Sequence, residues 1–173
     1  MLINKKEKVN GVHSLHCKTR KSWRSWLQKN HAKEKAVWLI MYGRASNTKG
    51  IDQATAVEEA LCFGWIDSKS IRRDDQSRYQ YFSPRKRKSA WSKINRERVE
   101  RLVKAGLMTP AGQALVDFAR KSGTWEALVD IENGIIPDDL KKAFARNKTA
   151  SKNFRAFAPS AQRIILQWIM MAK

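Results

Sequence analysis

The sequence predicts an α+β fold, with strands in the first half and helices filling the second. Three observations predict it. A short apolar run at 36–42, rich in branched and aromatic residues, is typical of a buried strand. Alternating residues over 65–72 and 78–83, with turn-forming residues between them, indicate an antiparallel hairpin. From residue 89 onward, capping residues and apolar spacings of three and four indicate successive helices.

The first 21 residues are basic and polar and show no periodicity. We therefore expect residues 1–21 to form a flexible basic tail. Order should begin at Ser22, which is suited to cap a short helix whose Trp23 and Trp26 fall on one face. Residues 22–88 are then predicted to form the α+β half, which contains the hairpin.

Capping residues also mark where the later helices begin. Asp52 is predicted to cap one helix, Ser89 another, and Thr109, followed by proline, a third. The final helix, over 160–172, has a wide apolar surface and is expected to pack into the core. These helices make up residues 89–173, the helical half, which we expect to pack on the α+β half as one compact unit.

The charge balance points to a polyanionic partner. Of 173 residues, 35 are Lys or Arg and 16 are Asp or Glu, which gives a net charge of +19. Such an excess favours nucleic acid or an anionic membrane surface, although a basic surface without any specific partner fits the same number. The sequence contains neither an apolar run long enough to span a bilayer nor a signal-peptide core, so we expect a cytoplasmic protein with no membrane span.

The reactive side chains predict no enzyme. Cys17 and Cys62 are too few for a disulfide framework, which favours a reducing environment. Residues 13–17 contain two histidines and a cysteine, but their spacing matches no common zinc pattern. The adjacent Glu58 and Glu59 lack a companion ligand and are expected on a solvated helix face. With no phosphate-binding loop or catalytic triad, we expect no catalytic residue, metal or cofactor.

The strongest electrostatic feature is a run of four cations, Arg-Lys-Arg-Lys, at residues 85–88. Such a run can neutralise phosphates, and two tyrosines on one face of the preceding strand are placed to stack on bases. The predicted polyanion-binding residues are Arg72, Arg73, Arg78, Tyr79, Tyr81, Arg85, Lys86, Arg87, Lys88 and Lys93. The alternative is a solvated loop with no partner.

Polar residues also fall among the core positions of the helix that follows. Asn95 and Arg98 lie inside the apolar arc that contains Trp91. Since an unpaired buried polar group costs about 1–3 kcal/mol, they should either anchor the hairpin to this helix, with Asp67 pairing with Arg98, or line a small pocket. The residues of this anchor or pocket are Glu58, Trp65, Asp67, Trp91, Asn95 and Arg98.

Several motifs resemble one bacterial family. Residues 56–67 read AVEEALCFGWID, residues 82–85 read FSPR, residues 89–102 read SAWSKINRERVERL, and residues 106–112 read GLMTPAG. These motifs are similar to the signatures of the YdeI/OmpD-associated family, also called bacteriocin-protection proteins, and the resemblance extends over residues 23–173. It implies an N-terminal half similar to the YjbR/CyaY-like superfamily, with a small antiparallel sheet and flanking helices, followed by a helical half.

The resemblance implies little about mechanism. The family name points to protection against antimicrobial agents, and relatives of YjbR are described as binding double-stranded DNA. Our leading hypothesis is a non-enzymatic protein that contacts nucleic acid through its basic hairpin and loop. The alternatives are a stress or bacteriocin-protection adaptor that acts through protein partners, and a small-molecule pocket or enzyme between the hairpin and the helix of Trp91.

Overall fold

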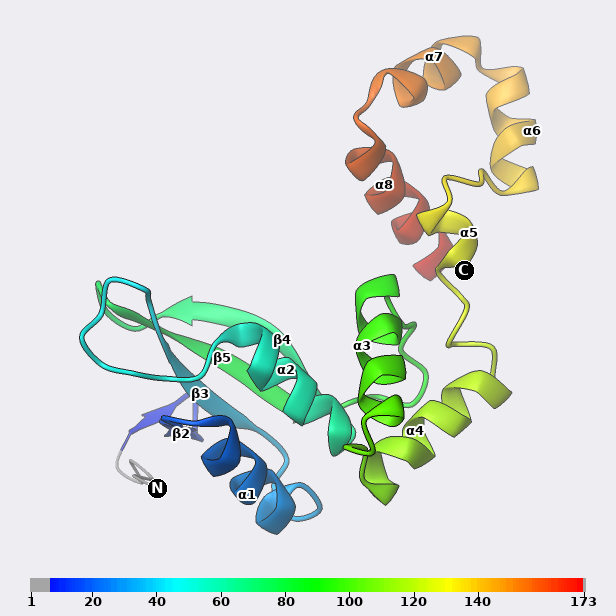
Figure 1. Ribbon diagram of the computed structural model, residues 1–173. Helices are drawn as coiled ribbons and strands as arrows, with labels where there is room; N and C mark the ends of the chain where they lie inside the picture. Colours follow the sequence, from blue (N-terminus) through cyan, green and yellow to red (C-terminus); the bar gives the residue numbers. More distant parts are fainter. Residues whose placement is uncertain (1–6, 173) are drawn as a thin grey trace.

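The computed structural model describes residues 7–172 and confirms the α+β fold class (Figure 1). One mixed sheet contains β1 (Lys8–Val9), β2 (Val12–Leu15), β3 (Val37–Tyr42), β4 (Trp65–Arg72) and β5 (Ser77–Pro84), in the order β1-β2-β3-β5-β4. The helices are α1 (Arg20–Asn30), α2 (Gln53–Cys62), α3 (Lys93–Lys104), α4 (Pro110–Lys121), α5 (Val129–Glu132), α6 (Asp138–Arg146), α7 (Lys148–Ala156) and α8 (Pro159–Met171).

The sheet is antiparallel except where β2 runs parallel to β3. The predicted hairpin is the pair β4 and β5, whose register runs from Trp65 opposite Pro84 to Arg72 opposite Arg78. A bulge interrupts this register between Asp67 and Ser70. The hairpin therefore has two distant ends, one at its turn and one where β5 leads into the basic run.

The prediction of a flexible tail is wrong for residues 7–21. Residues of this segment pair as β1 and β2 at the edge of the sheet, and Leu15 and Cys17 are buried. Thr19, three residues earlier than expected, caps α1, and Ser22 completes a reciprocal capping box with it. The strands are too short to show a period in the sequence. Residues 1–6 of the predicted tail lie outside the described residues.

Helices α1 and α2 cover one face of the sheet (Figure 1). The spacing of Trp23 and Trp26 places both indoles on the inner face of α1, stacked with centroids 5.3 Å apart. The indole nitrogen of Trp23 donates to the carbonyl oxygen of Ala56 at 3.0 Å, which ties α1 to α2. On the opposite face, Trp38, Ile40 and Tyr79 form a separate buried cluster with residues of the N-terminal strands.

The start of α4 packs tightly against the end of α2. The Thr109 hydroxyl caps α4 and donates to the carbonyl oxygen of Cys62 at 2.6 Å. A Cβ added to Gly112 would lie 2.3 Å from the same oxygen, so only glycine fits this contact. The predicted caps Asp52 and Thr109 are thus confirmed, whereas α3 begins after Ser92 rather than after Ser89.

The helical half is divided between two cores. Helices α3 and α4 share the first core through Val99, Leu102 and Val116, whereas α5 to α8 surround a second core built on Phe154 and Leu166. These last helices lie apart from the sheet (Figure 1). The final helix buries only part of its apolar surface, because other side chains on it face outward.

Two of those outward side chains are large and apolar. Ile164 is 69% exposed and Trp168 is 78% exposed, although the sequence predicted that this helix would pack into the core. A helix that is apolar on several sides cannot bury all of them against a small helical cluster. None of the helices in residues 7–172 is long and apolar enough to cross a membrane.

Candidate nucleic-acid interface

The predicted polyanion-binding residues divide between the two ends of β5. Arg72, Arg73 and Arg78 lie at the hairpin turn, whereas residues 85–88 follow the opposite end of the strand. At about 3.3 Å per residue, the strand separates the two groups by roughly 20 Å. The hairpin therefore does not bring Arg72, Arg73 and Arg78 next to the basic run, as the sequence had suggested.

The arginines at the hairpin turn are largely satisfied within the fold. Arg72 pairs with Asp75, and Arg73 pairs with Glu7 at 3.0 Å and with Asp74 at 2.8 Å. Arg78 donates to the side-chain oxygen of Gln53 at 3.0 Å. Nearby carboxylates thus neutralise two of the three cations at this end.

The two tyrosines lie on one face of β5, as predicted, but they are not free platforms. Tyr79 is buried and donates its hydroxyl to Glu7. Burial raises the pKa of Tyr79, and the hydrogen bond to Glu7 raises it further. Tyr81 is half-buried, packs edge-on against Trp38, and carries the Lys69 ammonium 5.0 Å from its ring centroid. Of the two tyrosines, only Tyr81 is therefore accessible enough to stack on a base.

The other end of β5 carries three cations in the open. Lys86, Arg87 and Lys88, the basic loop, are exposed and make no ion pair within residues 7–172. Ser89 closes the loop by donating its hydroxyl and its backbone N–H to the Lys86 carbonyl oxygen. The loop is therefore an ordered turn, and no carboxylate in the described part of the chain pairs with its charges.

Arg85 belongs to the same run of cations but lies inside the protein. It is 9% exposed, its guanidinium lies 3.9 Å from the centroid of the Trp91 ring, and it donates to the carbonyl oxygen of Ala90 at 2.6 Å. Burial lowers the pKa of Arg85 to about 10. Arg85 therefore holds the base of the basic loop and is not exposed to a phosphate.

A stack of rings and guanidiniums continues behind Arg85. Trp91 packs on Trp125 with centroids 5.0 Å apart, and Arg120 lies 5.0 Å from the Trp125 ring. Arg96 donates to the Trp91 carbonyl oxygen at 2.7 Å and pairs with Glu132 at 2.5 Å. Sequence reasoning missed Arg96 and Arg120, because no local pattern marks contacts between α3, α4 and α5.

Lys93, the last of the predicted polyanion-binding residues, begins α3. Its side chain is exposed, and its backbone N–H donates to Glu132 at 2.6 Å. Glu132 thus receives bonds from Lys93 and Arg96 together, and these bonds join α3 to the second core. Of the predicted polyanion-binding residues at this end of β5, the basic loop and the Lys93 ammonium remain available.

The predicted anchor residues do not converge on one place. The indole nitrogen of Trp65 donates to the His31 carbonyl oxygen at 3.1 Å, and Asp67 accepts from Gln53 and Gln80. Arg98 donates to Asn95 at 3.0 Å, so the predicted pairing of Arg98 with Asp67 is wrong. The physical reason is that α3 packs against α2, and α2 keeps it away from β4.

The adjacent glutamates of α2 differ sharply from the prediction of a solvated face. Glu59 is 1% exposed and is held by Arg20 at 2.5 Å and by Arg24 at 2.7 Å. Glu58 is 22% exposed and lies 3.6 Å from Arg20 and 3.3 Å from Arg101. The burial of Glu59 could not be predicted from the sequence, because its partners come from α1, more than 30 residues earlier in the chain.

Comparisons with protein families match two separate segments of the chain. Residues 15–115, more than half of the chain, match a family described as Domain of unknown function (DUF8412). The chain belongs to the DUF8412 family. The DUF8412 segment contains β3 to β5, α1 to α3 and the start of α4, and it therefore includes the basic loop.

Residues 133–173 match a second family, described as Bacteriocin-protection, YdeI or OmpD-Associated. This match confirms the predicted family over residues 133–173, whereas the motifs that suggested it, within residues 56–112, lie in the DUF8412 segment. No curated protein and no solved structure matches the chain. The similarity of the DUF8412 segment to the YjbR/CyaY-like superfamily therefore stays a prediction.

Proposed function

We propose that this protein is a non-enzymatic, cytoplasmic nucleic-acid-binding protein and that the basic loop is its principal contact. The observation that carries the proposal is that Lys86, Arg87 and Lys88 are exposed and that no carboxylate of residues 7–172 forms an ion pair with them. A loop of this kind attracts phosphates, because each phosphate that it neutralises releases a condensed counterion.

The surroundings of the loop support this proposal. The chain carries a net charge of +19, so the long-range field attracts a polyanion before contact. The Arg87 guanidinium lies 5.4 Å from the Phe118 ring, and buried Arg85 fixes the start of the loop. An ordered loop loses less conformational entropy on binding than a mobile one does.

The test measures binding to a short DNA duplex by fluorescence anisotropy at several salt concentrations. We expect the affinity of the wild-type chain to fall steeply with salt. In the triple variant Lys86→Ala, Arg87→Ala and Lys88→Ala, the slope of log affinity against log salt should become shallower by up to about 2.7. Single-stranded DNA is measured in parallel, because a preference for it would indicate base stacking on Tyr81.

A matched control removes the same charge elsewhere. Lys142, Lys148 and Lys152 are exposed lysines on α6 and α7, and their triple replacement by alanine also lowers the net charge by three. We expect this control to keep nearly the wild-type slope. Equal losses in both triple variants would show that only net charge matters, and the proposal of a dedicated loop would then be rejected.

A second candidate function is that of an adaptor that binds a protein. The exposed Ile164 and Trp168 on α8 favour it. These residues are four positions apart and so share one face of the helix, and exposed apolar patches of this kind are typical of interaction sites. These residues lie in the segment that matches the family described as Bacteriocin-protection, YdeI or OmpD-Associated. The double variant Ile164→Ser and Trp168→Ser should abolish capture of a protein partner and leave DNA binding intact.

A further inference from the structure

A pocket of about 490 Å³ opens between α1 and the start of α4. Arg24 and Gln28 line it from α1, and His31 and Phe63 line it from the positions that follow α1 and α2. Residues 109–111 line the remaining side. This volume lies within the range of small-molecule sites, about 300–1,000 Å³. The pocket is distinct from the basic loop, and it is not the pocket that the sequence suggested beside Trp91.

The wall of this α1–α4 pocket is rigid. Thr109 donates both its hydroxyl and its backbone N–H to the Cys62 carbonyl oxygen, at 2.6 and 3.1 Å. Gly112 permits that close approach, since any larger residue would clash with the same oxygen. A pocket fixed before its ligand arrives loses little entropy when the ligand binds.

Arg24 provides a positioned cation at the pocket. Its guanidinium lies 5.3 Å from the Phe63 ring centroid, and it donates to Glu59 at 2.7 Å and to the Leu107 carbonyl oxygen at 2.8 Å. Glu59 is shared with Arg20, and it is too deeply buried to line the pocket itself. The side chain of Arg24 is 32% exposed, so N–H donors remain for a ligand.

The rest of the lining selects an anion with an apolar body. Among the described residues, no carboxylate lines the pocket, and the N-terminal end of α4 adds a partial positive charge. Phe63, Pro110 and Ala111 offer an aromatic ring and aliphatic surface for the body of a ligand. A bare inorganic anion would leave these apolar side chains unused.

His31 adds a hydrogen-bonding group of defined polarity. Its Nδ1 lies 2.9 Å from the Leu27 carbonyl oxygen, and a carbonyl can only accept, so Nδ1 carries the proton. The His31 ring also lies 5.3 Å from the Phe63 ring at an interplanar angle of 54°, so the two rings contact each other at the side of the pocket.

We propose that the α1–α4 pocket binds a small aryl carboxylate. The carboxylate pairs with Arg24, and the ring packs against Phe63 and Pro110. The planar guanidinium of Arg24 matches the planar carboxylate, and the hydrogen bond to Glu59 fixes the orientation of the guanidinium. The proposal concerns a site that is separate from the nucleic-acid interface, and it survives if the basic loop does not bind DNA.

Benzoate is the probe, and benzamide is its neutral counterpart of nearly the same shape. Isothermal titration of the full chain should give saturable benzoate binding, with a dissociation constant of about 1 mM or below. Benzamide should bind about tenfold more weakly or worse, because it lacks the charge-assisted bond to Arg24. Equal binding of the two compounds, or no saturable binding of benzoate, would overturn the proposal.

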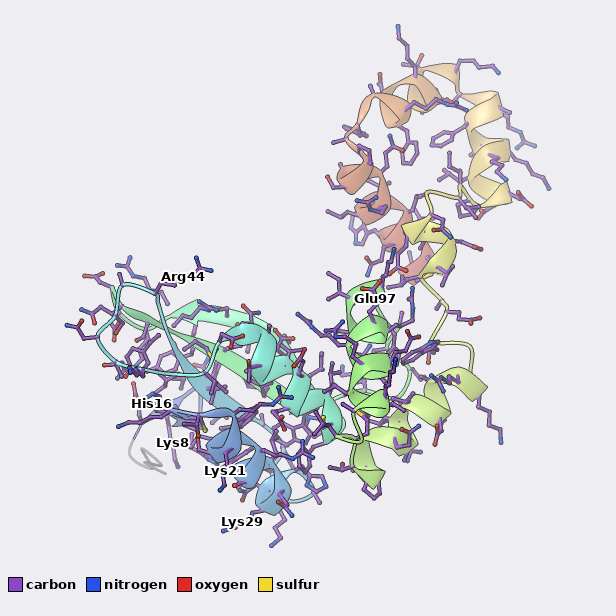
Figure 2. The ribbon with its side chains drawn as sticks, viewed as in Figure 1. Lys8, His16, Lys21, Lys29, Arg44 and Glu97 are labelled. Carbon is purple, nitrogen blue, oxygen red and sulfur yellow. The ribbon has the colours of Figure 1, made fainter. Side chains whose placement is uncertain are left out.

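Two tryptophan variants locate the binding. Gln28 is an exposed residue that lines the pocket, so Gln28→Trp should fill it and weaken benzoate binding about tenfold or more. Lys29 is also exposed, projects from the end of α1 (Figure 2) and does not line the pocket, so Lys29→Trp is the control and should bind as the wild type does. Unchanged affinity in Gln28→Trp would place benzoate elsewhere and reject the site.

Discussion

The Arg85 guanidinium lies 3.9 Å from the centroid of the Trp91 ring, while its Nε has no hydrogen-bond partner among residues 7–172. A buried cation is usually paired with a carboxylate, but here an aromatic face takes that place. The fold therefore tolerates an incompletely satisfied charge at the base of the basic loop.

Replacing Arg85 by an apolar residue of similar length should barely change stability. At neutral pH the guanidinium is charged in both the folded and unfolded states, so the full desolvation penalty acts on the folded state. Arg85→Met removes that penalty and also loses the ring contact and the bond to Ala90, and we expect a change within about 1 kcal/mol in the free energy of unfolding. Urea denaturation measures it.

The comparison variant is Arg85→Ala, which loses the same interactions and also leaves a cavity against Trp91. We expect it to be destabilised by about 2–3 kcal/mol. If Arg85→Met were as damaging as Arg85→Ala, the charge itself would be stabilising, and the interpretation of Arg85 as an incompletely satisfied cation would be wrong.

The adjacent glutamates of α2 should differ strongly when each is replaced by glutamine. Glu59→Gln places a neutral amide at the buried position that Arg20 and Arg24 share and weakens two charge-assisted hydrogen bonds, so we expect a loss of about 2–3 kcal/mol. Glu58→Gln affects pairs that are more open to solvent, and it should cost about 1 kcal/mol or less. Similar losses in the two variants, measured by chemical denaturation, would contradict this assignment.

Stability should fall in acid partly because of Glu7. Burial alone raises the pKa of Glu7, but hydrogen bonds from Arg73 and Tyr79 outweigh it, so the pKa lies below its ordinary value of 4.5. A carboxyl group with a lowered pKa stabilises the fold fully above the unfolded-state pKa. That contribution disappears as the pH falls through the lower folded-state pKa.

Glu7→Gln tests this assignment. The variant should be less stable than the wild type at about pH 6, and the difference should shrink towards about pH 3, as measured by urea midpoints across the range. A difference that stays constant with pH would show that Glu7 acts through packing and not through its charge.

Truncation at two positions on α8 should change the free energy of unfolding by very different amounts. Leu166 is 1% exposed in the second core, so Leu166→Ala should cost about 2–5 kcal/mol. Trp168 is 78% exposed, so Trp168→Ser should change the free energy of unfolding by about 0.5 kcal/mol or less. Thermal unfolding followed by circular dichroism measures both, and a large loss in Trp168→Ser would mean that its face is covered.

Elements set by local chemistry could be predicted from the sequence. The hairpin could be predicted because turn-forming residues separate its two strands, and Asp52 and Thr109 cap helices through bonds to residues three positions later. The strands at Lys8–Val9 and Val12–Leu15 escaped prediction because they have two and four residues, and β2 pairs with a strand more than 20 residues away. Whether these two strands form depends on pairing partners that the local sequence does not reveal.

The candidate site shows the same limit. Arg85 and Lys86 look equivalent in a run of four cations, yet one is buried and the other exposed. The difference comes from Trp91, whose ring covers the Arg85 guanidinium and is itself packed against Trp125, more than 30 residues later in the chain. Charge could therefore be predicted from the sequence, but which charges remain available to a partner could not.

The bulge between Asp67 and Ser70 has a consequence for behaviour at high concentration. Strand β4 is an edge of the sheet, and an edge strand offers unpaired N–H and C=O groups to any passing strand. The bulge breaks the regular spacing of those groups, and the exposed Lys69 adds a positive charge that repels the same strand of a second copy. The longest open edge of the fold is thereby protected against edge-to-edge aggregation.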